Sequence, residues 1–274
     1  MLFRSIIKVS GDGDAATPSG TMPLGSITRD DLKAIAEVTH LMQKKCTIHA
    51  RSGQKAAAAA EAGFDWVIHA SYMTEAELAV LFKHKTPICP TLSPLANAIE
   101  WGPDLGMPAA IADSYKRELD AASVILSKAH KGGLLMMAGT DAGLNPVPYG
   151  DWHARELEHL MNYLGMSAME AIKAGTHNAA LALGMQDRIG TLEEGKLADL
   201  LVVDGNPLDD IQVLQDRKRL KVIMKNGAVV DTATPLPQPT TYGWEKPFAA
   251  WPDVRLPDQD FVRRHAARKP AWML

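Results

Sequence analysis

The sequence predicts an α/β fold in which strands and helices alternate as in a TIM-like (β/α)8 barrel. Short apolar runs recur, and several of them end on a polar side chain, as in CTIHA (residues 46–50) and DWVIHA (residues 65–70). A helical pattern follows each run, and this order is typical of parallel strands joined by right-handed crossovers. Polar residues that end such strands share one mouth of a barrel, where its chemistry is concentrated.

The successive βα units follow from local signals. Capping-box patterns, Thr28 with Asp31 and Thr74 with Glu77, open two of the helices, and Gly63 ends an Ala-rich helix near 53–61. A long loop over residues 90–107 is expected. Strands are predicted at 4–9, 46–49, 65–69, 86–90 and 134–138, and later helices at about 108–131, 151–163 and 167–183.

The pattern changes near residue 187. Short β segments without amphipathic helices are expected at 188–192, 198–204, 220–225 and 229–230, and Asn226-Gly227 predicts a type I′ hairpin turn. We therefore expect three parts: a partial barrel with the site (1–186), a small β-sandwich segment (187–234) and an extended tail rich in Pro and Trp (235–274). The tail either packs on its own domain or covers a neighbouring subunit.

Bulk composition excludes several classes of protein. With 274 residues, 46% of them hydrophobic, and a net charge of −3, the chain offers no basic surface for nucleic acid. No apolar run is long enough to cross a membrane, and residues 1–10 are too short for a signal peptide, so a cytoplasmic location is expected. Cys46 and Cys89 are interpreted as buried strand residues. Strand alternation places Cys46 on the face of the strand opposite to that of His49, so Cys46 is not expected to be a metal ligand.

Four strand-end residues form the candidate site. Alternation places Ile6 with Lys8, Val67 with His69, and Gly139 with Asp141 on common faces, with the polar member last. Imidazoles and a carboxylate suit zinc, which lowers the pKa of bound water from about 15.7 to about 7. Asp141 could then carry a proton to the leaving nitrogen. Lys8, His49, His69 and Asp141 are thus the predicted metal residues, with Asp141 catalytic.

Each of these residues alone also fits a structural role. A single strand-end histidine often only forms hydrogen bonds, Lys8 could be solvated, and Asp141 could be a turn former; their joint spacing favours the site. His177 fits a helix-packing residue. His153 fits either a solvated helix position or the barrel mouth. Gly11-Asp-Gly13 does not fit a phosphate loop, because no helix begins there.

Together, Ile7-Lys8, His49-Ala50, His69-Ala70 and Gly139-Thr-Asp-Ala142 resemble the amidohydrolase superfamily, with the imidazolonepropionase-like and prolidase-like branch most similar. The run from Arg188 to Pro207 resembles the family's return from barrel to sandwich, and the similarity covers about residues 4–232. The five strands then correspond to strands 4–8, which implies an incomplete barrel.

The resemblance implies further roles. Lys8 matches a lysine that carbon dioxide carboxylates and that bridges two metals, so one or two divalent ions, zinc by expectation, are implied. His49, His69 and Asp141 match metal ligands, and Asp141 also matches the proton acceptor. Arg51 and Tyr149 occupy positions where relatives often have histidine, and these positions concern substrate binding.

The family's His-x-His pair and its first three barrel strands have no counterpart in this sequence. Two hypotheses follow. The chain is a metal-dependent hydrolase that cleaves a C–N bond in a small amide, dipeptide or carbamate-like substrate. Alternatively, it is an inactive remnant or split-enzyme subunit that needs a separate N-terminal piece. A homo-oligomer in which the tail closes the open barrel is a weaker third hypothesis.

Overall fold

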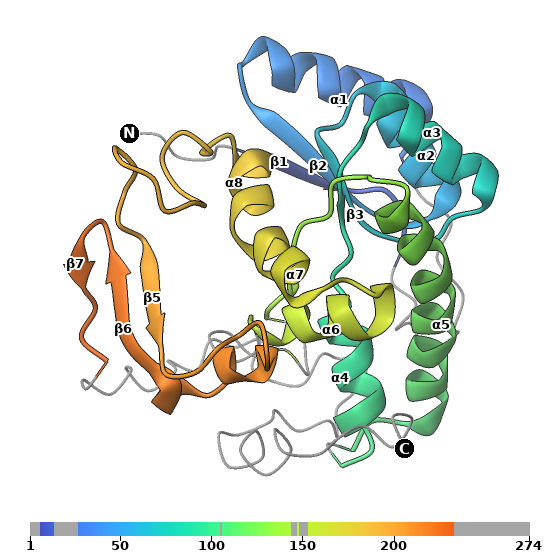
Figure 1. Ribbon diagram of the computed structural model, residues 1–274. Helices are drawn as coiled ribbons and strands as arrows, with labels where there is room; N and C mark the ends of the chain where they lie inside the picture. Colours follow the sequence, from blue (N-terminus) through green and yellow to red (C-terminus); the bar gives the residue numbers. More distant parts are fainter. Residues whose placement is uncertain (1–5, 14–26, 105, 144–146, 148–152, 233–274) are drawn as a thin grey trace, which may run out of the picture.

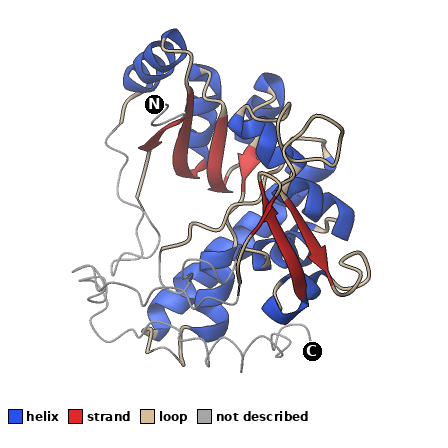
Figure 2. Cartoon of the chain, turned by 90° about the vertical axis from the view of Figure 1, so that its left-hand side faces the viewer, coloured by secondary structure: helices blue, strands red, loops and turns tan. Residues whose placement is uncertain are grey.

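The computed structural model describes residues 6–13, 27–104, 106–143, 147 and 153–232. Two sheets, four-stranded and three-stranded, lie apart in this part of the chain (Figure 2). The elements that build the first sheet and its helices are β1 (Ile6–Ser10), α1 (Arg29–Leu41), β2 (Lys45–Ser52), α2 (Gly53–Ala62), β3 (Trp66–Tyr72), α3 (Glu75–His84) and β4 (Ile88–Cys89). The elements that follow are α4 (Ser93–Trp101), α5 (Ala109–Lys131), α6 (Arg155–Leu164), α7 (Ala168–Gly175), α8 (His177–Leu183), β5 (Leu200–Val203), β6 (Leu220–Lys225) and β7 (Ala228–Val229), with short 3₁₀ helices at Ile211–Leu214 and Arg217–Arg219.

The larger sheet is parallel in the order β1-β2-β3-β4, as consecutive βα units predict. Helices α1, α2 and α3 pack side by side along it (Figure 1). The capping boxes predicted at Thr28 and Thr74 are both present, and Gly63 ends α2 at φ 88°. The alanines of α2, buried from Ala56 to Ala60, let this helix approach β2 and β3 closely.

Two apolar clusters cover the faces of the parallel sheet. The larger contains Ile48, Val67 and Ile88 together with the helices on their side. The smaller joins Trp66 and Met137 to Ala182 of α8, with Ile6, Ile68 and Cys89 packed against it. Register agrees with this division, because His49 is level with Ile68, and Ile68 is level with Cys89.

The sheet stays open in the described part of the chain. β1, the strand predicted at residues 4–9, lies at the edge of the sheet, and its Ile7 is 36% exposed. At the other side, the predicted strand 134–138 is reduced to one parallel bridge between Ile88 and Met136. The backbone hydrogen bonds of Ile88 with Leu135 and Met137 continue the parallel pairing there for only one step.

Part of the predicted loop 90–107 is helical, which corrects the sequence prediction. Helix α4 lacks a local cap of its own. The carboxylate of Glu156 on α6 accepts hydrogen bonds from the Leu92 and Ser93 amides, both at 2.8 Å, and from the Ser93 hydroxyl at 2.7 Å. A cap supplied by a distant residue leaves no signal beside the helix that it stabilises.

The helix predicted at 167–183 is divided in two. Ser167 and Glu170 form the expected capping box, and Gly184 ends α8 at φ 67°. Between them, Thr176 has φ −124° and ψ −90°, and its hydroxyl binds the Ile172 carbonyl at 2.7 Å. The neighbouring Asn178 donates to the Met136 carbonyl at 2.9 Å, which ties the start of α8 to the sheet.

The second sheet is antiparallel in the order β5-β6-β7. Asn226 and Gly227 have φ 54° and 78°, with Lys225 opposite Ala228, so the predicted two-residue hairpin turn is present. The segment 188–192 is not a strand. Its Arg188 amide bonds back to the Met185 carbonyl, and its Arg188 carbonyl accepts from the Leu197 amide, which makes it a closed loop.

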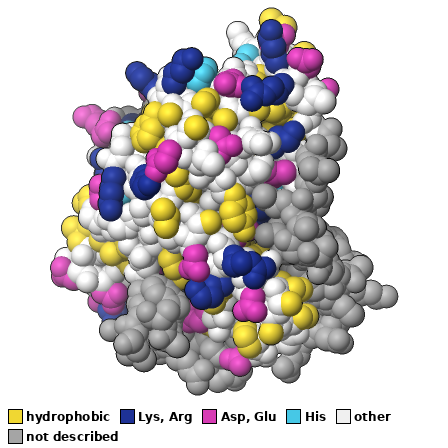
Figure 3. Space-filling model, turned by 90° about the vertical axis from the view of Figure 1, so that its right-hand side faces the viewer, with side chains coloured by type: hydrophobic (Ala, Val, Ile, Leu, Met, Phe, Trp, Pro, Cys, Tyr) yellow, Lys and Arg dark blue, Asp and Glu magenta, His cyan; other side chains and the backbone are white. Residues whose placement is uncertain are grey.

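Basic and acidic side chains are interspersed over the face that carries α3 and α5 (Figure 3). Such mixing gives no extended field of one sign on that face, consistent with the near-neutral composition. In the described part of the chain, no helix combines the length and apolar character that crossing a membrane would require.

Candidate metal centre

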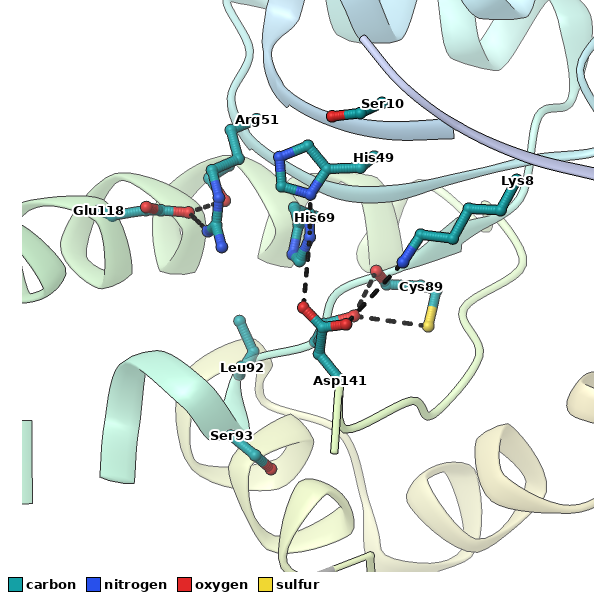
Figure 4. Close-up of polar contacts among 12 residues, drawn as sticks. Lys8, Ser10, His49, Arg51, His69, Cys89, Leu92, Ser93, Glu118 and Asp141 are labelled. Atoms are coloured by element: carbon teal, nitrogen blue, oxygen red, sulfur yellow. Dashed lines mark hydrogen bonds and ion pairs between the residues drawn. The ribbon is translucent and has the colours of Figure 1, made fainter. Parts of the chain in front are cut away.

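The four predicted metal residues form one chain of contacts beside the ends of β1, β2 and β3 (Figure 4). Lys8 Nζ lies 3.9 Å from Asp141 Oδ1, and Asp141 Oδ2 lies 4.0 Å from His69 Nε2. The same His69 nitrogen is 2.9 Å from His49 Nδ1. Residues separated by up to 133 positions in the sequence therefore present their head groups to one another, as the spacing predicted.

The two imidazoles meet edge to face, with ring centroids 4.5 Å apart and an interplanar angle of 74°. Two ring nitrogens at 2.9 Å cannot both present lone pairs to one another without repulsion. Either a proton is shared between them or a cation binds to both. Metal–nitrogen bonds near 2.0–2.1 Å place two ligands of a tetrahedral ion about 3.3 Å apart. A cation would therefore require the rings to separate slightly from the observed 2.9 Å, which is a usual hydrogen-bond length.

His49 is oriented from its other side. Its Nε2 lies 3.4 Å from the Gly13 carbonyl oxygen and 3.7 Å from Asp12 Oδ1. A carbonyl and a carboxylate favour the tautomer with the proton on Nε2, which leaves a lone pair on Nδ1, facing His69. An outer contact of this kind is common where histidine binds a metal.

Asp12 is a site residue that sequence reasoning missed. Its Oδ1 accepts the Arg51 amide at 2.9 Å, and its Oδ2 accepts the Ser52 amide at 2.8 Å and the Ser52 hydroxyl at 2.6 Å. The buried carboxylate thus holds the end of β2 against the segment after β1. The signal for Asp12 in the sequence is its position directly after a predicted strand, within Gly11-Asp-Gly13.

His69 reaches the site through an unusual backbone, which corrects the simple alternation argument. Val67 packs in the larger cluster, whereas Ile68 faces the smaller one together with Cys89, so regular pleating would direct His69 away from His49. Instead, His69 and Ala70 have φ 73° and 56°, and the β2–β3 register shifts between Ala50 and Ser52. The irregular strand end turns the imidazole toward the site.

Strained backbone concentrates here. Among the described non-glycine residues, seven have positive φ, and four of them lie at this site: His69, Ala70, Thr91 and Asp141. Each such conformation costs roughly 1–3 kcal/mol and persists only where surrounding contacts enforce it. Strain that clusters around convergent polar groups favours a functional origin.

A buried ion pair lies behind His69. The Arg51 guanidinium contacts the Glu118 carboxylate of α5, and Ser71 Oγ donates to the same carboxylate at 2.7 Å. Arg51 and Glu118 are 1% and 0% exposed. Arg51, which was predicted to bind substrate, is therefore held beside the site by an ion pair with Glu118, a residue that the sequence analysis did not identify. Its role in substrate binding remains a prediction.

His69 is fully buried, and burial, followed by the charges of Arg51, His49 and Lys8, lowers its pKa well below the usual value. The imidazole is thus neutral at physiological pH, which is the form that binds metals. Its Nδ1 has no hydrogen-bond partner within the described part of the chain. A buried polar atom without a partner is a rare and unfavourable feature outside functional sites.

The lysine and the carboxylate lie at the open side. The side chains of Lys8 and Asp141 are 51% and 24% exposed, so solvent and small molecules can reach them. Below them, burial raises the pKa of Cys89 to about 12, so this thiol stays protonated. A Cβ on Gly139 would lie 2.5 Å from Cys89 Sγ, which explains the glycine two residues before Asp141.

Other predicted residues lie elsewhere. Tyr149 lies outside the described residues. His153 is exposed, and its Nδ1 lies 3.1 Å from the hydroxyl of Thr140, so it flanks the site at one residue's remove from Asp141. His177 pairs with its neighbour Asn178 at 3.1 Å at the start of α8.

The residues present fit a divalent metal ion. They combine imidazole nitrogens, a carboxylate and a lysine amine, and each of these head groups lies within 4.0 Å of the next one in the series. Imidazole and carboxylate donors are the set that zinc and similar first-row ions bind. The orphaned nitrogen, the strained strand ends and the outer contacts of His49 are further observations of the kind expected for such a centre.

Comparisons with known proteins agree with this interpretation. The model of the Amidohydrolase family matches residues 12–230. Ochratoxinase of Aspergillus niger is 28% identical over 223 residues, which is 81% of this chain and 45% of that protein. Imidazolonepropionase of Thermoplasma volcanium is 36% identical over 87 residues, 32% of this chain and 22% of that protein.

A solved Xaa-Pro dipeptidase with methionine bound in its active site superposes with a TM-score of 0.71 at 26% identity. The match covers 83% of this chain and 54% of that one. The chain therefore spans about half the length of the ochratoxinase and the dipeptidase that it matches. These matches to proteins of the amidohydrolase fold confirm the predicted α/β class and imply a TIM-like barrel architecture.

Proposed function

Because this chain belongs to the amidohydrolase family, we propose that it is a metal-dependent hydrolase that cleaves a C–N bond in a small amide, dipeptide or carbamate-like substrate. The observation that carries the proposal is the continuous series of contacts from Lys8 through Asp141 and His69 to His49. Distant segments supply these groups, so their convergence has no explanation in local structure alone.

Lys8, His49, His69 and Asp141 would hold one or two divalent ions, zinc by preference of the donor set. When bound, such an ion supplies Lewis acidity toward a carbonyl and lowers the pKa of a water molecule from about 15.7 to about 7. The protein's part is to keep the His69 imidazole neutral, which its burial provides, and to orient the His49 ring, which the contact with the Gly13 carbonyl provides.

Asp141 is the proposed proton carrier. Its carboxylate lies at the solvent-facing side of the imidazole pair, 24% exposed, so a substrate can approach it directly. From this position it would accept a proton from the attacking water and donate it to the leaving nitrogen. An amine leaves far more readily once protonated, so this transfer is the step that a C–N bond requires.

Lys8 is the proposed site of carboxylation. Its amine is accessible, with half of the side chain exposed, so carbon dioxide can reach it. Addition of carbon dioxide to the neutral amine gives a carbamate and releases a proton, which converts a cation into an anionic oxygen ligand. The Lys8 carbamate and the Asp141 carboxylate would then be two neighbouring anions, and a cation between them would stabilise both.

Arg51 and Tyr149 are the proposed contributors to substrate binding. Arg51 would act from behind His69, because its guanidinium is held by Glu118 and its charge also acts on the His69 imidazole. We expect its effect on substrate choice to be indirect, through the shape of the pocket.

We propose the organisation predicted from the sequence: an incomplete barrel over 1–186, part of a β-sandwich over 187–234 and a tail over 235–274. Leu201, Val202 and Val229 are 47–68% exposed on the second sheet. A second copy or an additional segment would cover them, and sedimentation of the purified chain tests the first alternative. The cytoplasmic location also remains a prediction.

The test uses the full chain, purified and supplied with zinc and bicarbonate. Bound metal is measured directly, and hydrolysis is assayed with a panel of dipeptides and N-acyl amino acids. We expect about one or two equivalents of metal and turnover of at least one amide. Less than about a tenth of an equivalent, unrecoverable by added zinc and bicarbonate in folded protein, contradicts the metal centre.

A further inference from the structure

A second group of potential metal ligands lies at the opposite ends of the same strands. His40 belongs to the last turn of α1, Cys46 to the start of β2, and Asp65 to the turn that leads into β3. Cys46 Sγ is 3.9 Å from His40 Nε2, and that nitrogen is 3.1 Å from Asp65 Oδ2. One ligand atom from each of the three residues lies within 4.8 Å of the other two.

These separations match those of ligands on a single ion. Zinc binds sulfur at about 2.3 Å, nitrogen at about 2.0–2.1 Å and carboxylate oxygen at about 2.0–2.2 Å, so ligand atoms in a tetrahedral site are about 3.3–3.6 Å apart. The observed distances of 3.1 Å and 3.9 Å lie on either side of this range. We propose that His40, Cys46 and Asp65 bind a zinc-class divalent ion, with a water in the fourth position.

Two of the three ligands are already fixed. The Cys46 amide donates to Asp65 Oδ2 at 2.8 Å, and the Asp65 amide donates to the Cys46 carbonyl at 3.0 Å. The turn from α1 into β2 is closed by hydrogen bonds from Gln43 to His40 and from Lys44 to Thr39. An ion binding here would therefore need little rearrangement beyond a small movement of the His40 ring.

Access also suits a metal site. The His40 side chain is 44% exposed and that of Asp65 22%, whereas Cys46 is fully buried. An ion can therefore enter from the His40 side and meet the thiol at the inner end. A hydrogen bond between His40 and Asp65 accounts for that pair alone and not for a buried thiol directed at the same ring nitrogen.

The group is separate from the candidate metal centre. Cys46 precedes His49 by three residues on β2, which places their backbones about 10 Å apart at the usual rise of a strand. Thiolate, imidazole and carboxylate together favour zinc over magnesium or calcium. An ion here would join α1, β2 and the start of β3, so its effect would be on stability, as expected for that end of a barrel.

The experiment is a cobalt titration of the metal-free full chain, because cobalt bound to a thiolate gives a near-ultraviolet charge-transfer absorption. We expect this absorption in the natural sequence and in Cys89→Ser, and its loss in Cys46→Ser. Cys89→Ser is the matched control, since the other thiol lies beside the candidate metal centre. His40→Gln should weaken cobalt binding at least about tenfold, the lower end of losses for outer contacts of a metal.

Two outcomes would overturn the proposal. One is absorption that survives in Cys46→Ser and disappears in Cys89→Ser, which would place the thiolate at the other end of the strands. The second is no thiolate absorption in natural-sequence protein whose circular dichroism shows it to be folded. Neither result depends on hydrolysis, so failure here is distinguishable from failure of the proposed activity.

Discussion

The two ends of the parallel sheet are built in different ways. At the carboxyl ends of β2 and β3, side chains from distant segments meet, His69 and Ala70 have positive φ, and the His69 Nδ1 atom is buried without a partner among the described residues. At the amino ends, short turns close on themselves. The Asp65 amide donates to the Cys46 carbonyl, and the Cys46 amide donates to the Asp65 carboxylate.

This difference indicates that one end of the sheet serves function and the other serves stability. Strain and unpaired polar atoms lower stability, so their concentration at one end indicates that this end was selected for something else. The other end carries satisfied turns and fixes the order of strands and helices. Substitutions of the convergent side chains at the carboxyl ends should therefore lower activity, whereas substitutions in the turns at the amino ends should leave activity unchanged.

The largest expected effect is that of Asp141→Asn on hydrolysis. Asparagine cannot accept the proton, so kcat/KM should fall by about 10²–10⁴-fold, the contribution typical of general acid–base catalysis. Asparagine tolerates the positive φ of 50° at this position, so thermal unfolding should change little. Asp120→Asn, an exposed carboxylate on α5, is the control, and equal losses in both variants would remove Asp141 from the mechanism.

Next in size is the buried pair behind His69. Arg51→Met leaves the Glu118 charge buried without its partner, and Glu118→Met does the same to the Arg51 charge, so either substitution should lower the free energy of unfolding by about 3–5 kcal/mol. The double variant Arg51→Met, Glu118→Met should recover much of this stability, because neither charge remains. Chemical denaturation of the four proteins measures the coupling, and strict additivity would show that the pair is not an energetic unit.

Gly139→Ala should destabilise the same end more moderately. The added Cβ would lie 2.5 Å from Cys89 Sγ, and overpacking of this kind costs about 1–3 kcal/mol. Combining it with Cys89→Ala removes the clashing sulfur and should restore most of the loss. If the second substitution brings no recovery, another contact must require the glycine.

Local signals predicted the amino-terminal half of the sheet well. The capping residues Thr28 and Thr74, Gly63 and the alternating runs all act within a few positions of the elements that they specify. Helix α4 was not predicted, because its cap is the distant residue Glu156. The helix at 167–183 was predicted as continuous, because Asn178, which ties the start of α8 to the sheet, acts through a tertiary contact.

The candidate site was predictable in its residues and not in its supports. Lys8, His49, His69 and Asp141 end apolar runs, which the sequence displays. The turned backbone of His69, the contacts of Asp12 and the pairing of Arg51 with Glu118 depend on segments brought together by folding. Alternation along β2 relates Cys46 only to residues of its own strand, whereas its approach to His40 depends on the packing of α1 against the sheet.

A further effect concerns pH and the cap of α4. Burial raises the pKa of Glu156 to about 7, so the folded state binds a proton more tightly than the unfolded chain, whose value is near 4.5. Stability should therefore fall as pH rises from about 4.5 to about 7, by at most about 1.4 kcal/mol per pH unit. Glu156→Gln should flatten this slope in urea unfolding measured across the range, and an unchanged slope would assign it to other groups.

The smallest effect tests the amino ends directly. Gln43 ends the turn after α1 at φ 55°, a conformation that glycine adopts without the steric cost carried by a Cβ. Gln43→Gly should therefore raise the free energy of unfolding by up to about 1 kcal/mol and leave kcat/KM unchanged, because strain here serves no chemistry. His69 also has a positive φ, but relieving its strain by substitution with glycine would remove the imidazole from the site. If Gln43→Gly impairs hydrolysis, the separation between the two ends of the sheet does not hold.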